Sequence, residues 1–497
     1  SADYNVSGGW RTNWSYENNI SSTPTALLGE SATFGALGSS NEIHGAGADG
    51  YNIFLPSVGE TQDAIAYIAS DYNTGWMVGD SKLATLSDTE AVNDFEYVEG
   101  YGDFTAGSEW TTNTGWSTSG NVATKTGGTG SNYISKSLGT SLVSGKWYQA
   151  EFDLLSGSAN SVLLVNRHTS GVVKPYSGGL TNVDVAFFAV GSKGYAIWKQ
   201  SHFNNGGISL YAGSSVSVDN FKVYEINALD RSVNSNPLIR VGTVTKTAVA
   251  TGADLMAYGG FSASNYLTRP HNNDFEFGTG NWSMTGWISQ NGTASTQHPI
   301  QLGLTSGSSS EISILRQTSS SAMLLGFRVR GDSGSYAANP AGGLMIDNVW
   351  THFVLTKKGN LLMWYINGKL IHSVASSNVG NIGFSSSDIL RIGHGASTVT
   401  ADVMKLALLR ISATAPSVEQ IKKMYNDEKH LFQENAKATL YGSSDAVTAL
   451  AYDDDTELLH AGTSAGRSVF QGLRRVDNTT DAVGAAISAS NGFIVED

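Results

Sequence analysis

Apolar and polar residues alternate along much of this chain, and the alternation is clearest between residues 272 and 432. Phe275 and Phe277, and then Trp282 and Met284, are spaced two residues apart on either side of a glycine-rich turn. A period of two predicts strands with one buried face. Further on, Asn367-Gly368 separates two apolar runs, which predicts a tight hairpin because both residues tolerate positive φ.

One helix is predicted at the end of this segment, from Pro416 to Lys429. Ser417 is placed to cap its first turn, and Gln420 three residues later completes a capping box. Four apolar side chains fall on one face, which predicts that this face packs on the strands: Val418, Ile421, Met424 and Tyr425.

The order of these pieces resembles the concanavalin A-like, laminin-G-like jelly-roll family. The resemblance rests on the opening Asp274–Gly280, the strand Trp350–Leu355, the hairpin Tyr365–Leu370, the strand Leu390–Gly393 and the closing strand with its helix. It implies a two-sheet sandwich over residues 272–432. Such sandwiches serve lectins, adhesins and glycosidases alike, so the resemblance implies the fold more than the function.

A second unit of alternating strands is predicted from residue 93 to residue 228. Its central strand runs from Lys146 to Leu154, and we expect Trp147, like Phe152, to be a core residue. The unit resembles a carbohydrate-binding-module jelly roll in four places: Gly102-Asp103-Phe104, the early Trp110 and Trp116, Gly145–Tyr148 and the closing Val218–Val223.

Hairpins outside these two units share a layout of apolar strand, polar turn and apolar strand ending near glycine. Copies lie at residues 64–86, 247–260 and 448–470. The layout is that of β-propeller blades, although a glycine-rich β protein also contains such hairpins by chance.

The predicted fold class is therefore all-β and multidomain. A hairpin-repeat, β-propeller-like scaffold occupies residues 1–92, 229–271 and 433–497. Two β-sandwich jelly rolls, the carbohydrate-binding-module-like one at 93–228 and the laminin-G-like one at 272–432, are inserted into it or flanked by it.

Composition narrows the class of protein. Charged residues make up only 15% of the chain, with 57 glycines, and this profile is typical of an all-β extracellular or virion protein. The net charge of −13 disfavours nucleic-acid binding. The absence of cysteine favours a bacterial or phage product. No apolar run reaches the ~20 residues that span a bilayer, so membrane insertion is not expected.

Exposed aromatic rings are the usual platform for sugars, because the C–H faces of a pyranose pack on a π face. The candidates for carbohydrate binding are Trp110, Trp116, Tyr133 and Trp198. The alternative for each is a place in the hydrophobic core, where most aromatic side chains of a sandwich lie.

The module resemblance also implies a structural calcium ion between the first and last strands of residues 93–228. Asp103 and Asp219 hold the matching positions, and carboxylates suit this hard cation. The alternative is that both acids cap turns. No catalytic residue is assigned, because the strands identified in 272–432 carry no pair of acids at alternating positions facing one cleft.

Together, these features predict a non-catalytic attachment protein of the phage or viral tail-fibre type, at the virion surface or otherwise extracellular. Its expected partners are host-cell glycans and other virion proteins, and the analogy with phage fibres implies a homotrimer. Two alternatives stay open: a depolymerase acting on surface polysaccharide, and a purely structural virion component.

Overall fold

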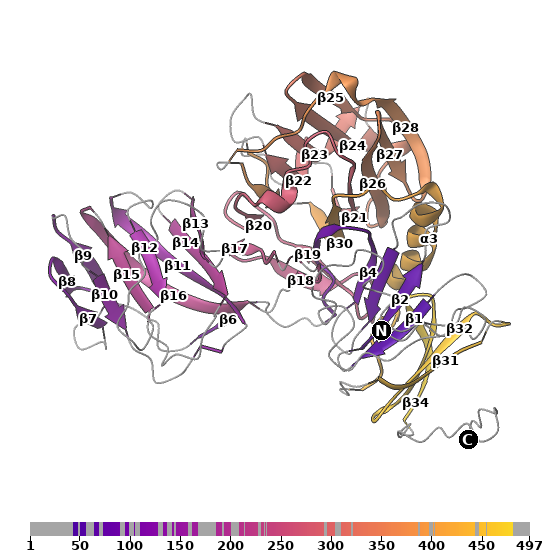
Figure 1. Ribbon diagram of the computed structural model, residues 1–497, viewed down its shortest axis with the longest axis horizontal. Coiled ribbons are helices and arrows are strands. Elements are labelled where there is room, and N and C mark those ends of the chain that lie inside the picture. The colour runs from indigo at the N-terminus through magenta and orange to yellow at the C-terminus, as the bar shows by residue number, and fades with distance from the viewer. Residues whose placement is uncertain are drawn as a thin grey trace, which may run out of the picture. The chain divides into compact units, whose positions relative to one another are not determined.

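The chain folds into antiparallel β-sheets, as a computed structural model shows (Figure 1). The structure describes residues 43–480 with internal gaps, of which the longest are 56–63, 167–184, 200–207 and 304–309. The described residues include one α-helix, α3 (Val418–Glu428), so the predicted all-β class is confirmed. Asn93–Ala228 forms a smaller compact unit, and Ser1–Val92 with Leu229–Asp497 forms a larger one.

The larger unit contains a sandwich of two sheets, here called the main sandwich. Its first sheet has seven strands, in this spatial order: β17 (Ile239–Val241), β20 (Tyr266–Arg269), β29 (Leu390–Ile392), β22 (Gln297–Gly303), β23 (Glu311–Ser319), β24 (Ala322–Gly331) and β25 (Gly334–Ala338). Three short 3-10 turns lie on connections between this sheet and the second one: η3 (Asn273–Phe275), η4 (Ala341–Gly343) and η5 (Ser376–Asn378).

The second sheet of the main sandwich has eight strands. Seven of them follow in this spatial order: β18 (Thr245–Ala248), β19 (Met256–Gly259), β30 (Met404–Ser412), β21 (Trp282–Gln290), β26 (Thr351–Lys358), β27 (Leu361–Ile366) and β28 (Lys369–Ala375). The eighth strand, β5 (Ser81–Thr85), pairs with β30. The predicted Asn367-Gly368 hairpin joins β27 to β28 with φ of 50° and 74°, which confirms the turn.

Two further sheets of the larger unit have four strands each in chain order. They are β1 (Ile43–Gly47), β2 (Gly50–Leu55), β3 (Ala64–Ile68) and β4 (Asn73–Val78), and then β31 (Val447–Asp453), β32 (Leu458–Thr463), β33 (Gly466–Gln471) and β34 (Arg474–Thr479). Each resembles a propeller blade in topology and contains strands of one predicted repeat copy. Among the described strands there is no third sheet of this kind.

The predicted middle copy, 247–260, has a different role. Its strands β18 and β19 extend the eight-stranded sheet, and β17 and β20 belong to the seven-stranded sheet. Every residue of β19 is buried, which is typical of a strand covered on both faces. The segment 229–271, which the sequence pattern assigned to the scaffold, therefore contributes four strands to the main sandwich.

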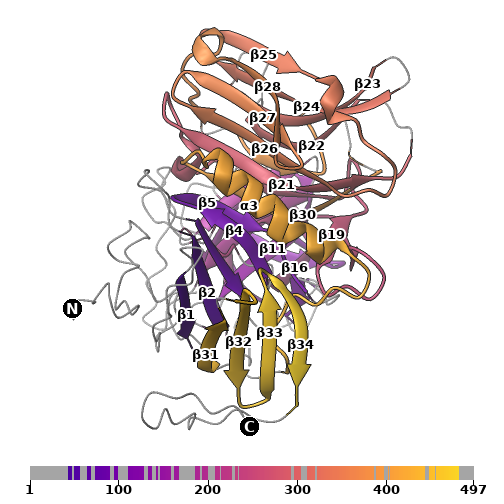
Figure 2. The same cartoon turned by 90° about the vertical axis from the view of Figure 1, so that its right-hand side faces the viewer.

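Helix α3 lies between the main sandwich and the two four-stranded sheets (Figure 2). Ser417 and Gln420 form the predicted capping box. Ile421 and Met424 are fully buried in one core that also contains Trp76 of β4, Trp287 of β21 and side chains of β32 and β33. Val418, which we expected on the packed face, is exposed instead because it occupies the first helical position. A short 3-10 turn, η6 (Lys429–Phe432), follows the helix.

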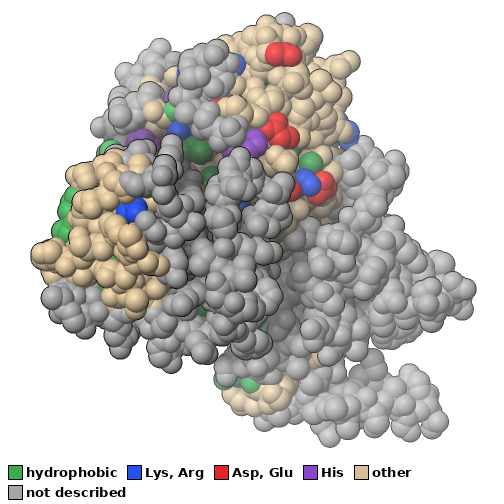
Figure 3. Space-filling model, turned by 60° about the vertical axis from the view of Figure 1, so that its left-hand side comes forward, with side chains coloured by type: hydrophobic (Ala, Val, Ile, Leu, Met, Phe, Trp, Pro, Cys, Tyr) green, Lys and Arg blue, Asp and Glu red, His purple; other side chains and the backbone are tan. Residues whose placement is uncertain are grey.

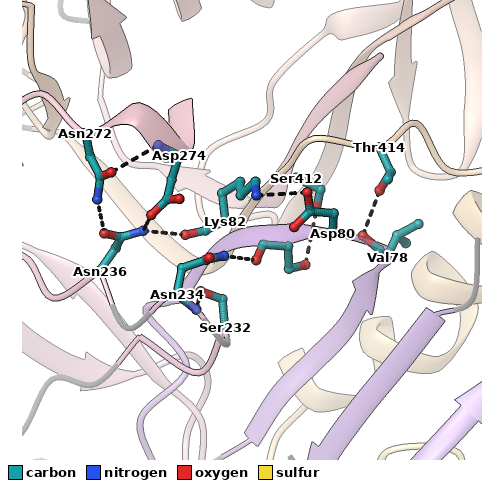
Figure 4. Close-up of polar contacts among 11 residues, drawn as sticks. Val78, Asp80, Lys82, Ser232, Asn234, Asn236, Asn272, Asp274, Ser412 and Thr414 are labelled. Atoms are coloured by element: carbon teal, nitrogen blue, oxygen red, sulfur yellow. Dashed lines mark hydrogen bonds and ion pairs between the residues drawn. The ribbon is translucent and has the colours of Figure 1, made fainter. Parts of the chain in front are cut away.

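A polar network attaches the segment before β17 to β5 and to the start of the main sandwich (Figure 4). The Asn236 amide donates to the Lys82 carbonyl at 3.0 Å and to the Asp274 carboxylate at 2.8 Å. It accepts from Asn272, and the Asn234 amide donates to the Ser81 carbonyl at 2.8 Å. One amide side chain thus joins three segments that are distant in sequence.

Asp230 is the buried carboxylate next to this network. It accepts hydrogen bonds from the backbone N–H groups of Ala84, Ser232 and Asn236 and from the Ser232 hydroxyl, at 2.6–2.9 Å. Burial raises the pKa of Asp230 to about 6, although these donors oppose the shift.

This pKa makes the stability of the larger unit depend on pH. The folded state holds the Asp230 proton to a higher pH than the unfolded state, so folding takes up a proton between about pH 4 and pH 6. We expect Asp230 to contribute about 3 kcal/mol of stability at pH 4 that is lost as pH rises through 6. Urea unfolding at pH 4 and pH 7 measures this.

The matched variant is Asp230→Asn, which keeps the shape of the side chain and cannot titrate. Its unfolding free energy should lack that contribution, so the difference between wild type and variant should change by about 3 kcal/mol across the interval. Parallel pH profiles for the two chains would contradict the assignment.

The smaller unit also has two sheets. One has four strands in the order β12 (Val162–Asn166), β15 (Ile208–Ala212), β10 (Tyr133–Lys136) and β7 (Trp110–Thr112). The other contains β13 (Val185–Val190), β14 (Lys193–Lys199), β11 (Trp147–Ser156), β16 (Val216–Ile226), β9 (Val122–Lys125) and β8 (Trp116–Ser119), with β6 (Phe95–Tyr97) paired to β16. A single hydrophobic core includes residues of both sheets.

Candidate functional site

Three of the four aromatic residues predicted to bind sugar lie in the core of the smaller unit. Trp110, Trp116 and Trp198 are 7%, 6% and 2% exposed. The Trp110 ring lies 4.9 Å from Phe104 and 5.5 Å from Phe221, measured between centroids. This burial favours the core alternative, because a covered ring offers no face to a ligand. Tyr133 belongs to β10, but its side chain lies outside the described residues.

Of the two predicted calcium ligands, the structure describes one, Asp219. Asp103 lies outside the described residues. Asp219 lies on β16 opposite Asp153 and accepts from the backbone N–H of Asn220 at 2.7 Å. No cluster of three acidic or histidine side chains that suits a metal occurs in the part of the chain that is described. The calcium site stays a prediction.

Trp147 differs from its sequence interpretation as a core residue. It is half-buried and does not belong to the core that contains Phe152. The two residues are five positions apart on β11, and an odd separation places side chains on opposite faces of a strand. Trp147 therefore belongs to the outer face of the sheet.

In the larger unit, polar side chains from three neighbouring strands gather on one face of the seven-stranded sheet. Gln301 of β22 pairs with Ser313 of β23, which pairs with Arg328 of β24. The apolar row beside them, Ile300, Ile314 and Phe327, points to the opposite face and is fully buried. We call His298, Gln301, Glu311, Ser313 and Arg328 the polar row.

Glu311 is the centre of the polar row. Its Oε1 accepts from Gln301 Nε2 at 2.9 Å and from the Ser313 hydroxyl at 2.5 Å, and lies 3.7 Å from a guanidinium nitrogen of Arg328. Its Oε2 is buried with no hydrogen-bond partner within the described structure. A buried carboxylate held this way fixes the position of the cation beside it.

Burial favours a neutral His298 and leaves Arg328 as the accessible cation of the row. Burial lowers the pKa of His298, opposed by the charge of Glu311 and assisted by that of Arg328. The Arg328 side chain is 28% exposed, whereas Glu311 is fully buried. Arg328 is thus the member of the row that reaches solvent, and its guanidinium has five donors to offer a ligand.

Sequence reasoning did not find the polar row. Glu311 and Ser313 alternate with Ile312 and Ile314, so a period-two pattern was available in β23. Nothing in the sequence indicated that β22 and β24 would place Gln301 and Arg328 beside them. The usable signal is the density of polar residues at strand positions that point away from the core.

Comparison with known families supports the fold of the main sandwich. The profile of the concanavalin A-like lectin/glucanases superfamily matches residues 261–422, so the predicted laminin-G-like domain is confirmed. The match includes all five members of the polar row. No curated protein matches the chain.

Solved structures show remote similarities. Domain 4 of an extracellular GH43 arabinanase from Geobacillus stearothermophilus, solved with arabinotriose, is 16% identical over 39% of this chain and 90% of that domain, with a TM-score of 0.31. The binding domain of Paraclostridial Mosquitocidal Protein 1 is 14% identical over 48% of this chain and 62% of its own, with a TM-score of 0.33. The binding domain of botulinum neurotoxin serotype D is 15% identical over 49% and 60%, also with a TM-score of 0.33. Similarities this remote carry no functional conclusion.

Proposed function

We propose that this chain is a non-catalytic glycan-binding attachment protein whose laminin-G-like sandwich contacts sugar through Arg328. The observation that most supports this proposal is the Glu311–Arg328 pair of the polar row, where a buried carboxylate positions a partly exposed guanidinium. Sugar hydroxyl oxygens accept hydrogen bonds, and hydrogen bonds to a charged group are worth about 1.5–3 kcal/mol each. Glu311 is then a positioning residue, and Arg328 contacts the ligand.

The surface suits an uncharged polar ligand. Figure 3 shows charged side chains scattered over the coloured part of one face. A site on such a surface exchanges water for sugar with little net gain, so we expect dissociation constants of ~0.1–1 mM for one site. Attachment then requires several sites at once, and a homo-oligomer such as the trimer expected from phage fibres would supply them.

We place this protein at a virion surface or in a tail fibre, in contact with host-cell glycans and other virion proteins. The support for this setting is the composition: few charges, no cysteine and abundant glycine. The alternative of a glycan depolymerase requires two carboxylates facing the same sugar bond. The polar row contributes one, Glu311.

The test is a glycan array on the full chain, together with a screen for release of reducing ends. Removing the contact should lower affinity, so Arg328→Ala is expected to weaken binding at least tenfold, and Glu311→Gln by a smaller factor because it only releases Arg328. Lys369→Ala is the matched control, since Lys369 is an exposed cation on the other sheet of the same sandwich.

Two results would contradict the proposal. Unchanged binding by Arg328→Ala and Glu311→Gln would place the sugar site elsewhere. Release of reducing ends that disappears in Glu311→Gln would instead support the depolymerase.

A further inference from the structure

A fully buried histidine, His352, lies on the face of the main sandwich that α3 covers. It belongs to β26 and is 0% exposed. Its ring lies 5.1 Å from the Trp287 ring of β21 and 6.1 Å from the Tyr425 ring of α3, measured between centroids. Neither ring nitrogen has a hydrogen-bond partner in the described part of the chain. Because buried polar groups are nearly always paired, this exception points to a role other than packing.

One buried ion pair lies beside the His352 ring. Arg410 of β30 is close enough for its charge to oppose protonation of the histidine. The guanidinium donates to Glu428 of α3 at 2.7 Å, and Trp287 Nε1 donates to the same carboxylate at 2.6 Å. The single negative charge of Glu428 therefore already balances Arg410. We call His352, Trp287, Arg410, Tyr425 and Glu428 the α3 junction.

The other titratable groups on the packed elements are neutral, positive or already paired. Tyr365 of β27 has a pKa raised by burial, so it carries no charge near neutral pH. The Nζ atom of Lys429 lies 5.5 Å from the Tyr425 ring and adds positive charge. Asp427 of α3 forms an ion pair with Lys423 at 3.2 Å. A proton on the histidine would thus add a second buried cation to a junction with one carboxylate.

The histidine therefore binds a proton more readily when the α3 junction is open. Burial and the charge of Arg410 hold the pKa of His352 well below its ordinary value of 6.5. When α3 leaves the sheet, the ring meets water and regains its ordinary pKa. Below about pH 6.5 the open state binds more protons than the closed one, so the closed state loses stability as pH falls. Asp230 acts in the opposite direction, because burial raises its pKa.

We propose that the α3 junction is an acid-sensitive switch, closed near neutral pH and opened when His352 takes up a proton. Opening exposes the surfaces that α3 and the eight-stranded sheet bury against each other (Figure 2). The two sheets of the main sandwich stay packed, because their shared core lies on the other face of β26, where Phe353 meets Trp364 and Phe327. The switch is independent of the proposed glycan binding.

Hydrogen exchange of the full chain at pH 7 and pH 5 measures the opening, with protection factors corrected for the intrinsic effect of pH on exchange. His352→Phe keeps a ring in the site, removes no hydrogen bond and cannot take up a proton. The ratio of variant to wild-type protection in residues 418–428 should rise about 20-fold from pH 7 to pH 5, because one proton taken up on opening changes protection nearly tenfold per pH unit. Asp230 and the other histidines cancel in this ratio, since both chains contain them.

Two further variants make the result specific. His352→Leu should show the same pH dependence even if it packs less well at pH 7, because it also lacks the titrating group. His372→Phe is the matched control, since His372 lies on β28 of the same sheet, half-buried, with its Nε2 bonded to the Tyr336 hydroxyl at 2.8 Å. Its ratio to wild type should stay within about twofold across the pH range.

Two results would overturn the switch. The first is an α3 protection ratio that does not change with pH in either His352 variant. The second is an acid-dependent loss of protection in wild type that is equally large in β23 and β24, because that result would indicate unfolding of the whole unit in place of a local opening.

Discussion

Replacing Glu428 with alanine is expected to destabilise the larger unit by about 3–5 kcal/mol, because the change leaves the Arg410 charge buried without its partner. The two side chains are 0% and 2% exposed, and Arg410 donates to Glu428 at 2.7 Å. The cost also includes two more hydrogen bonds, because the Trp76 backbone N–H and Trp287 Nε1 both donate to this carboxylate, at 2.9 and 2.6 Å.

The position of Glu428 explains why one carboxylate has so large an effect. It ends α3, and its donors come from β4, β21 and β30. A four-stranded sheet, the helix and the main sandwich therefore meet at one group. Gly75 is pressed against the same carboxylate, so a side chain there would clash with it as well.

Urea unfolding of the full chain, with hydrogen exchange to assign each transition to a unit, measures this effect. Glu434→Ala is the matched control, because Glu434 is exposed just beyond the helix and should cost less than about 0.5 kcal/mol. A loss below 1 kcal/mol in Glu428→Ala would show that water or another donor replaces the carboxylate, against the closed network described above.

How far the sequence predicted this fold depends on the range of the interactions involved. The helix and its capping box depend on residues three positions apart, and the Asn367-Gly368 hairpin on adjacent ones, so both were predictable. The partners Trp76 and Glu428 are 352 positions apart, and no local pattern announces them. The polar row was also missed because no local pattern indicates it: its members come together only when three strands pair.

Two sequence interpretations failed for more specific reasons. The hairpin at 247–260 has the spacing of a blade, but spacing does not say which sheet edge a hairpin joins, and β19 pairs with β30. Trp147 was assigned to the core with Phe152 although their odd separation opposes it. Applied strictly, strand parity would have found the outer face of β11 from the sequence.

Replacing Trp110 with alanine is expected to destabilise the smaller unit by about 3–5 kcal/mol, the usual cost of deleting a large buried aromatic side chain. The ring packs between Phe104 and Phe221 at centroid distances of 4.9 and 5.5 Å, and Lys136 Nζ lies 5.9 Å from its centroid. A cavity of this size in the core that joins both sheets cannot be filled by small shifts of its neighbours.

This variant also decides between the two interpretations of the tryptophans that the sequence left open. Hydrogen exchange of the full chain should show loss of protection confined to residues 93–228, and Trp110→Phe should recover part of it because a ring still fills the site. Leu155→Ala, an exposed position of the same unit, should stay within about 0.5 kcal/mol of wild type. If Trp110→Ala instead keeps full protection and loses only sugar binding on the glycan array, the ring is a sugar platform and its interpretation as a core residue is wrong.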